Sequence, residues 1–200
     1  MPKRIRREPI YIAPKILGSI LEGGNYYVID ELNREELNPE NVFDKIKIYE
    51  RQVKGWFLEP ALKMANYKPA NKGFLVLMTC LSYIEGVEQY KMGSTSNNSS
   101  KRTFRSGLRR LYPQLGSDEQ IDRLYNQGRC GLFHDGMVKG QIIIDYNFQD
   151  SIKFEDNNDI KINPKKLIND IATDFNNYIE TLKIDIISRD KFDRMFSNVV

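Results

Sequence analysis

The segment GFLVLMTCLSYIEGVEQY, at residues 73–90, constrains the fold more than any other part of the chain. Its first half is apolar on nearly every side, so a helix formed here has no polar face to present to water. Such a helix is stable only where other elements surround it. We therefore predict a central, buried helix, in which Gly86 is a weak helix former.

The first and last predicted helices both open with an Asn-Pro pair. Asn38 is a candidate N-cap, and Pro39 suits the first helical position, where its missing N–H has no partner to lose. The last helix opens in the same way with Asn163 and Pro164. Apolar residues then recur at helical spacing in both segments, which predicts one buried face on each helix.

Two further helices are predicted between these. KRTFRSGLRRLY, at residues 101–112, separates its apolar residues from its basic residues, and Pro113 stops it. Ser117 and Gln120, in SDEQ, form the capping-box signature that opens the next helix. Gly136 is well placed to end that helix.

Residues 140–162 change to the short period of strands. QIIIDYNF, SIKFE and DIKIN are β-branched and separated by turns rich in Asp and Asn, so we predict a small antiparallel insertion. Residues 1–37 alternate apolar patches with breakers such as Pro14 and Gly23, which predicts a partly irregular N-terminal extension. The predicted fold class is therefore mainly α: a bundle of about five helices over residues 38–200, with the β insertion before the last helix.

Basic residues gather in two parts of a chain whose formal net charge is only +3. One is the N-terminal KRIRR, and the other is KRTFRSGLRR at residues 101–110, which contains no acid. Local positive patches on a chain that is nearly neutral overall are more typical of a protein that contacts phosphates at a few places than of one that coats nucleic acid. Each run is open to two interpretations, a track for RNA phosphates or a solvated charged surface. The candidate RNA-binding residues are Arg102, Arg105, Arg109 and Arg110.

Cys80 and Cys130 both fall in apolar helical patterns, without a CxxC pair or a Cys/His cluster. We therefore expect buried free thiols in a reducing cytoplasm, and neither a zinc site nor disulfides. The N-terminus lacks the apolar core of a signal peptide, and no run approaches the roughly 18 apolar residues of a membrane span. The sequence predicts a cytoplasmic protein without a membrane partner.

Absent motifs narrow the chemistry further. The chain has no P-loop, Rossmann, HExxH or GxSxG motif. Its single histidine, His134, excludes a metal site with several histidine ligands within one chain. We therefore expect no metal and no cofactor, and any chemistry has to use His134 together with carboxylates, Lys, Tyr or Arg.

The stretch NQGRCGLFHDG, at residues 126–136, holds the strongest candidate pair, Arg129 and His134. Five residues on an ideal α-helix correspond to about 140° of rotation, so the two side chains converge only if the helix ends near Phe133. Histidine moves protons near neutral pH, arginine stabilises a crowded phosphoryl group, and RNA supplies its own 2′-OH as nucleophile. An ordinary helix end, with a surface arginine and a histidine favoured by the helix dipole, explains the same spacing.

Several neighbours could support this pair. Glu85 either pairs with Arg129 and orients it or marks where the central helix emerges into solvent. Asn126 and Tyr125 lie one turn before Arg129 and could line the same cleft, although Tyr125 also fits a core position. The loop GSTSNNSS, at residues 93–100, either only connects two helices or moves over the cleft and gates it.

RCGLFHDG follows the helix DEQIDRLYNQG and lies between the central helix and the final helix. This arrangement resembles the R-x(4–6)-H signature of the HEPN superfamily, over residues 38–187 as architecture and over 129–136 as sequence. The resemblance implies a metal-independent endoribonuclease that acts on single-stranded RNA as a homodimer, with two copies of the motif facing each other. It implies that Arg129 binds and polarises the scissile phosphate, and that His134 is the general acid or base. The products would carry a 2′,3′-cyclic phosphate and a 5′-OH, and the setting would be a microbial defence or toxin–antitoxin system.

Cys130 departs from the family pattern, in which a polar Asn, Asp or His often follows the arginine. This departure leaves room for a catalytically inactive HEPN module that binds RNA, a nucleotide or a protein partner such as an antitoxin. A third possibility is a structural helical interaction protein, in which Arg129 and His134 are surface residues.

Overall fold

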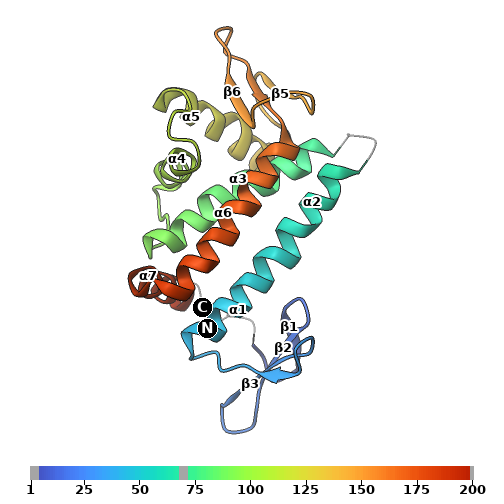
Figure 1. Ribbon diagram of the computed structural model, residues 1–200, viewed down its shortest axis with the longest axis vertical. Helices are drawn as coiled ribbons and strands as arrows, with labels where there is room; N and C mark the ends of the chain where they lie inside the picture. The colour runs from blue at the N-terminus through green and yellow to red at the C-terminus, as the bar shows by residue number, and fades with distance from the viewer. Residues whose placement is uncertain (1–4, 68–71, 199–200) are drawn as a thin grey trace. The chain divides into compact units, whose positions relative to one another are not determined.

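The computed structural model describes the backbone of residues 5–67 and 72–198 (Figure 1). The chain divides into two compact units. The first unit comprises residues 1–59, 90–95 and 177–200, and the second comprises residues 60–89 and 96–176. None of the helices within the described ranges combines the length and the hydropathy that a membrane crossing requires.

The first unit begins with a four-stranded antiparallel sheet, in the order β1-β2-β3-β4. Its strands are β1 (Ile10–Ala13), β2 (Ile16–Ile20), β3 (Tyr26–Asp30) and β4 (Glu35–Glu36). Lys15 adopts φ 60° in the turn between β1 and β2, and Gly24 adopts φ 85° in the turn between β2 and β3. One face of the sheet is buried, including Ile16 and Val28, which are 0% exposed.

This sheet corrects the predicted fold class. The protein is a mixed α/β fold with two sheets, so the prediction of a mainly α bundle with one small β insertion is wrong. The apolar patches within residues 10–30 are strands, and the breakers between them are the turns of successive hairpins. The sequences IYIA, ILGSI and YYVID do not alternate strictly between apolar and polar residues, so periodicity alone does not identify them as strands.

Helix α1 (Val42–Val53) follows the sheet and continues through a π-helical turn, η1 (Lys54–Leu58). Asn41 caps α1, since its side chain accepts hydrogen bonds from the backbone N–H groups of Phe43 and Asp44. The predicted cap at Asn38 is therefore wrong, and Asn38 lies in the preceding turn. The segment 177–184 of α6 (Pro164–Ile184) and helix α7 (Ile186–Asn198) complete this unit.

The second unit is built around α3 (Gly73–Met92), the helix predicted to be central and buried. That prediction is confirmed, because Val76, Leu77, Leu81 and Ile84 are 0% exposed. Cys80 is also buried and is a free thiol, whereas the free thiol of Cys130 is only half-buried. The other helices that contribute to this unit are α2 (Glu59–Asn66), α4 (Ser100–Leu111), α5 (Asp118–Leu124), η2 (Tyr125–Asp135) and the first part of α6.

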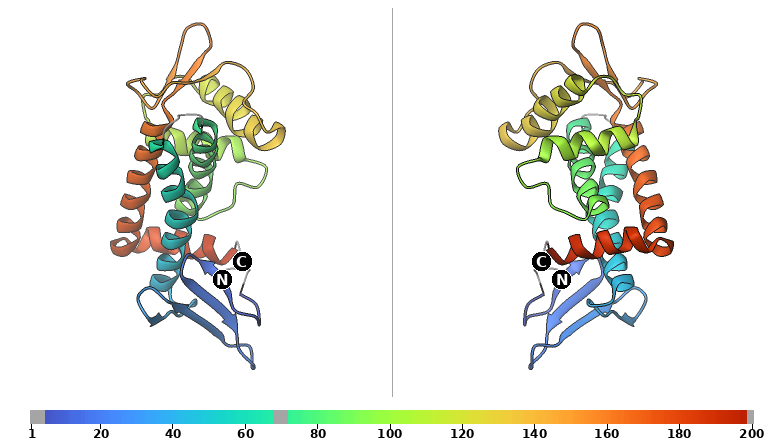
Figure 2. Two further views of the ribbon diagram at one scale, coloured as in Figure 1. Left: turned by 90° about the vertical axis from the view of Figure 1, so that its right-hand side faces the viewer. Right: turned by 90° about the vertical axis from the view of Figure 1, so that its left-hand side faces the viewer.

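Helices α3 and α4 cross (Figure 2), and Gly107 of α4 lies at their contact. A Cβ atom added to Gly107 would lie 2.6 Å from the carbonyl oxygen of Ile84 and 3.3 Å from Cβ of Glu88. Real Cβ atoms do not approach other atoms that closely, so the absence of a side chain at Gly107 sets the separation of the two helices.

The second unit also contains a three-stranded sheet of β5 (Ile142–Ile144), β6 (Ile152–Phe154) and β7 (Ile160–Ile162). The predicted antiparallel arrangement is wrong, because β7 lies between the other two strands and pairs parallel with β5. Asn163 caps α6 as predicted, accepting from the backbone N–H groups of Lys165 and Lys166. Its amide also donates to the carbonyls of Tyr146 and Phe148, so it holds the β5–β6 connection against the helix start.

Candidate active site

Arg129 and His134 lie together in the π-helix η2, not in an α-helix. Hydrogen bonds in a π-helix join residues five apart, so such residues lie about one turn apart along the axis. The separation of about 140° that an α-helix imposes on this spacing therefore does not apply. In an ideal π-helix, positions 129 and 134 therefore fall on one side.

Glycines allow this wide helix to form and to end. A Cβ atom at Gly131 would lie 2.6 Å from the carbonyl oxygen of Met137, so the chain that follows the helix packs directly against it. The backbone N–H of Lys139 then donates to the carbonyl of Gln127 at 2.8 Å. Gly136 adopts φ 69° and ends the helix, as the sequence predicts.

Glu85 of α3 holds Arg129 by charge. The Nη2 atom of Arg129 lies 3.0 Å from Oε2 of Glu85, whose side chain is only 8% exposed. The two atoms form an ion pair without the alignment of a hydrogen bond, and Nε of Arg129 is buried without a hydrogen-bond partner among the described residues. Of the two interpretations of Glu85 that the sequence leaves open, the structure shows the paired one.

Two aromatic rings flank the same guanidinium. Its central carbon lies 5.8 Å from the ring centroid of Tyr125 and 5.0 Å from that of Phe133. Tyr125 is buried and also packs against Phe104, so it belongs to the core and to the site. Phe133 was not predicted as a site residue, although its i, i+4 spacing from Arg129 is the signal that could have found it.

The serine-rich loop reaches this site through Ser96. Its hydroxyl donates to Oε1 of Glu85 at 3.2 Å, and its backbone N–H donates to the side chain of Gln89 at 2.8 Å. The Ser96 and Ser100 hydroxyls also lie 3.2 Å apart. The loop therefore contacts the carboxylate that holds Arg129, which no pattern in its sequence predicts.

The remaining predicted site residues differ in their surroundings. His134 and Asn126 are exposed, and no hydrogen bond or ion pair involves either side chain within the described part of the chain. Cys130 is half-buried. Burial raises the pKa of the Tyr125 hydroxyl, and a hydrogen bond with Cys130 raises it further.

The four arginines of α4 divide into two kinds. Arg105 pairs with Asp118 at 2.9 Å and with Asp122 at 2.7 Å, and Arg109 also pairs with Asp118 at 2.9 Å. Arg110 pairs with Glu88 at 2.9 Å and with Asp174. Arg102 is exposed, and no ion pair includes it among the residues that the structure describes. Three of the predicted RNA-binding residues thus bind carboxylates within the second unit.

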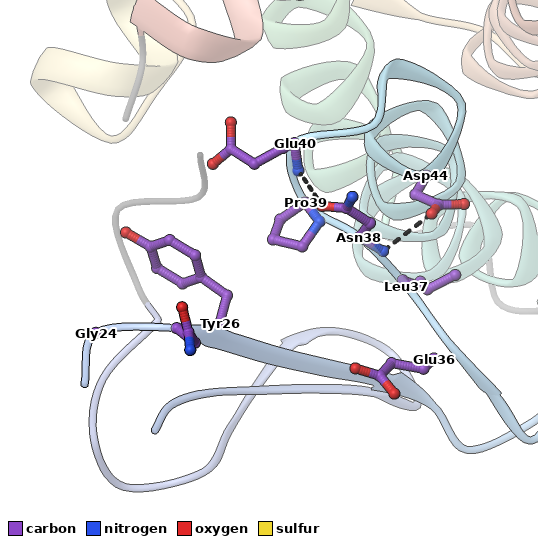
Figure 3. Close-up of a pocket in the computed structure, with 9 residues that line it drawn as sticks. Gly24, Tyr26, Glu36, Leu37, Asn38, Pro39, Glu40 and Asp44 are labelled. Carbon is purple, nitrogen blue, oxygen red and sulfur yellow. Dashed lines mark hydrogen bonds between the residues drawn. The ribbon is translucent and has the colours of Figure 1, made fainter. Parts of the chain in front are cut away.

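A pocket of about 690 Å³ lies in the first unit, and its lining is acidic (Figure 3). Glu36, Glu40 and Asp44 give its lining three carboxylates, and Tyr26 contributes an aromatic ring. The backbone N–H of Asn38 donates to Asp44 at 2.9 Å, so this carboxylate holds the wall in place. A lining with this charge repels phosphates, so this pocket is a poor candidate for phosphate chemistry.

No group of three or more His, Cys, Asp or Glu side chains within the described residues is arranged to hold a metal ion. No family model, curated protein or solved structure matches this chain. The assignment of a chemistry therefore depends on the residues of the site. These are an arginine anchored by a buried carboxylate, an exposed histidine on the same side of a π-helix, and two aromatic rings.

Proposed function

We propose that this protein is a metal-independent endoribonuclease of the HEPN type, in which Arg129 and His134 act on the scissile phosphodiester. The observation that supports it best is the π-helix η2, since residues five apart fall on one side of such a helix in its ideal geometry. The anchoring of Arg129 by Glu85 adds the preorganisation that stabilisation of a developing charge requires.

The chemistry follows from the groups present. Arg129 binds the non-bridging phosphate oxygens and stabilises the charge that builds on them. His134 transfers a proton, and its exposed position gives a substrate access to the imidazole. The 2′-oxygen loses its proton and bonds to phosphorus, the bond to the 5′-oxygen breaks, and that oxygen gains a proton. The products are a 2′,3′-cyclic phosphate and a 5′-OH.

A homodimer fits this chemistry, because the reaction needs one group to accept a proton and another to donate one. Each chain has a single histidine, and two chains facing each other supply both groups. We place this activity on single-stranded RNA in the cytoplasm, in a microbial defence or toxin system with an antitoxin or another protein as regulator. The proposed reaction uses no cofactor.

A second candidate function is a HEPN module that binds RNA without cleaving it. Cys130 favours it, because a polar Asn, Asp or His often follows the arginine in active members of that family and a cysteine stands here instead. The two functions differ in the fate of bound RNA.

The deciding experiment incubates the protein with labelled single-stranded RNA in excess EDTA, beside the variants His134→Ala and Arg129→Lys. His134 is exposed, so its replacement leaves the fold intact, and Arg129→Lys retains the charge beside Glu85. We expect cleavage that ends in cyclic phosphates and is lost in both variants. RNA that is bound and stays intact supports the binding module instead, and neither binding nor cleavage supports a structural interaction protein.

The dimer is tested by mass measurement in solution. A mixture of His134→Ala chains with Arg129→Lys chains then asks whether two chains share a site. Cleavage by a protein that stays monomeric at the assay concentration would contradict a site composed of two chains.

A further inference from the structure

Phe133 combines exposure with contact to the candidate site. Its side chain is 42% exposed, its ring centroid lies 5.0 Å from the guanidinium carbon of Arg129, and it immediately precedes His134. The ring is therefore held near the phosphate-binding group and still accessible to a ligand. The buried Tyr125 contacts the same guanidinium but lacks this accessibility.

We propose that Phe133 stacks an unpaired base of RNA next to the phosphate that Arg129 binds. This inference rests on the proposed function of the site. Proteins that bind single-stranded RNA pair positive groups for the phosphates with aromatic rings for the bases. Phe133 and Arg129 provide both elements at one place, from positions four apart on one helix.

Stacking on Phe133 selects the state of the RNA more than its sequence. Every base has a stacking face, so a phenyl ring accepts all four. A base inside a duplex is already stacked on its neighbours and is not available to the ring. The site therefore takes RNA that is unpaired beside the scissile phosphate, such as a loop or a bulge.

The test measures binding separately from cleavage. RNA with 2′-fluoro groups at every position lacks the nucleophile, so it binds without being cut. We expect Phe133→Ala to weaken the binding of a single-stranded 2′-fluoro oligonucleotide by about tenfold, and Phe133→Tyr to bind like the natural chain. Phe133→Leu keeps an apolar side chain against Arg129 but has no aromatic face, so it should bind as weakly as Phe133→Ala. Binding of the matching duplex should not change.

Phe74→Ala is the matched control. Phe74 is 44% exposed, and it lies on α3 eleven residues from Glu85, about 16 Å along the helix. Loss of a phenylalanine of similar exposure outside the site should leave the affinity unchanged.

Unchanged affinity in Phe133→Ala overturns the inference, as does an equal loss in Phe133→Tyr or in duplex binding. A natural chain that binds the single strand but cleaves no unmodified RNA contradicts the proposed nuclease, and the tenfold effect of Phe133→Ala then still supports stacking. A natural chain that binds no RNA overturns both.

Discussion

Nη2 of Arg129 lies 3.0 Å from the carboxylate of Glu85, whose side chain is only 8% exposed. A carboxylate at such a depth is stable only beside a cation or hydrogen-bond donors. Within the described residues, the hydroxyl of Ser96 makes the other polar contact to this carboxylate. The residue proposed to bind the phosphate therefore also stabilises the fold, and its replacement has two effects that must be separated.

A double-mutant cycle separates them. We expect Arg129→Ala to lower the free energy of unfolding by about 1–3 kcal/mol, because it leaves Glu85 without its cation while Arg129 itself was already 24% exposed. Adding Glu85→Gln removes the buried charge, so the double variant should be more stable than the sum of the single effects predicts. Urea unfolding gives the free energy of unfolding of the natural chain, the two single variants and the double variant. Strictly additive effects would show that the ion pair contributes nothing.

Ser96 is expected to act as a positioning residue. Without its hydroxyl, Oε1 of Glu85 loses its donor, and the carboxylate is free to move relative to Arg129. If the chain cleaves RNA as proposed, Ser96→Ala should lower kcat by about tenfold with little change in KM, since the bond to a charged group contributes about 1.5–3 kcal/mol.

Ser96→Thr retains a hydroxyl and should recover most of the rate. Ser94→Ala is the control, because Ser94 is an exposed serine of the same loop. A rate that falls equally in the Ser94 and Ser96 variants would point to a general loosening of the loop and against a specific contact.

Arg110 and Arg102 make a matched pair on α4. The side chains of Glu88 and Asp174, which bind Arg110, are 8% and 13% exposed, so Arg110→Ala removes a cation that binds two largely buried carboxylates. We expect it to lower the free energy of unfolding by about 2–4 kcal/mol. Arg102→Ala removes an exposed side chain and should change stability by less than about 0.5 kcal/mol.

The Arg102→Ala variant also tests the basic helix as an RNA track. Arg102→Ala should weaken RNA binding and reduce the slope of affinity against salt by about one, which a titration over several salt concentrations measures. No change in either quantity would leave α4 as a charged surface whose arginines bind carboxylates of the protein itself.

Local signals in the sequence account for part of this structure. Ser117 and Gln120 form the predicted capping box, Gly136 ends its helix as predicted, and Asn163 caps the last helix. Each of these depends on hydrogen bonds between residues close in the chain. The apolar run of α3 likewise predicts its own burial, because no arrangement of its side chains gives it a polar face.

The features that sequence reasoning missed depend on contacts between distant segments. The width of η2 accompanies a close approach of Met137 to Gly131, and spacing on an α-helix therefore gave the wrong geometry for Arg129 and His134. The parallel pairing of β5 with β7 joins two segments that β6 separates in the sequence. Ser96 has no sequence signal at all, since any serine in such a loop has the same composition around it.

Asp118 should make stability depend on pH in the acid range. A hydrogen bond from Arg109 lowers the pKa of Asp118 below its ordinary value of 3.8, and the charges of Arg105 and Arg109 lower it further. The carboxylate of Asp118 then binds a proton more tightly in the unfolded chain than in the folded one. The ionised form of Asp118 therefore contributes its full stabilisation above about pH 4, and this stabilisation is lost as the pH falls through the pKa of the folded chain.

We therefore expect Asp118→Asn to reduce the urea midpoint at pH 6 and to have a smaller effect below pH 3. Asp156→Asn is the control, because Asp156 is exposed and forms no ion pair among the described residues. A difference between natural chain and Asp118→Asn that stays constant from pH 6 to pH 2.5 would show that the ionised form of Asp118 contributes nothing.

Replacement by alanine is expected to have opposite effects on stability at Gly107 and at Gly86. Gly107→Ala places a Cβ atom 2.6 Å from the carbonyl oxygen of Ile84, a backbone atom that moves only if the two helices separate. We expect a loss of about 1–3 kcal/mol in the free energy of unfolding. Gly86→Ala meets no atom within 4 Å and replaces a weak helix former with a strong one, so it should gain about 0.5–1 kcal/mol.

Gly86 also lies on α3 only one residue beyond Glu85, so its variant reports on the surroundings of the site. If Gly86→Ala raises stability and leaves RNA cleavage and solution mass unchanged, this position faces solvent in the working protein. A gain in stability with loss of the dimer would place a second chain against Gly86, because the added methyl group then meets a neighbour that a single chain does not contain. A loss of stability in the monomer would contradict the open space seen at this position.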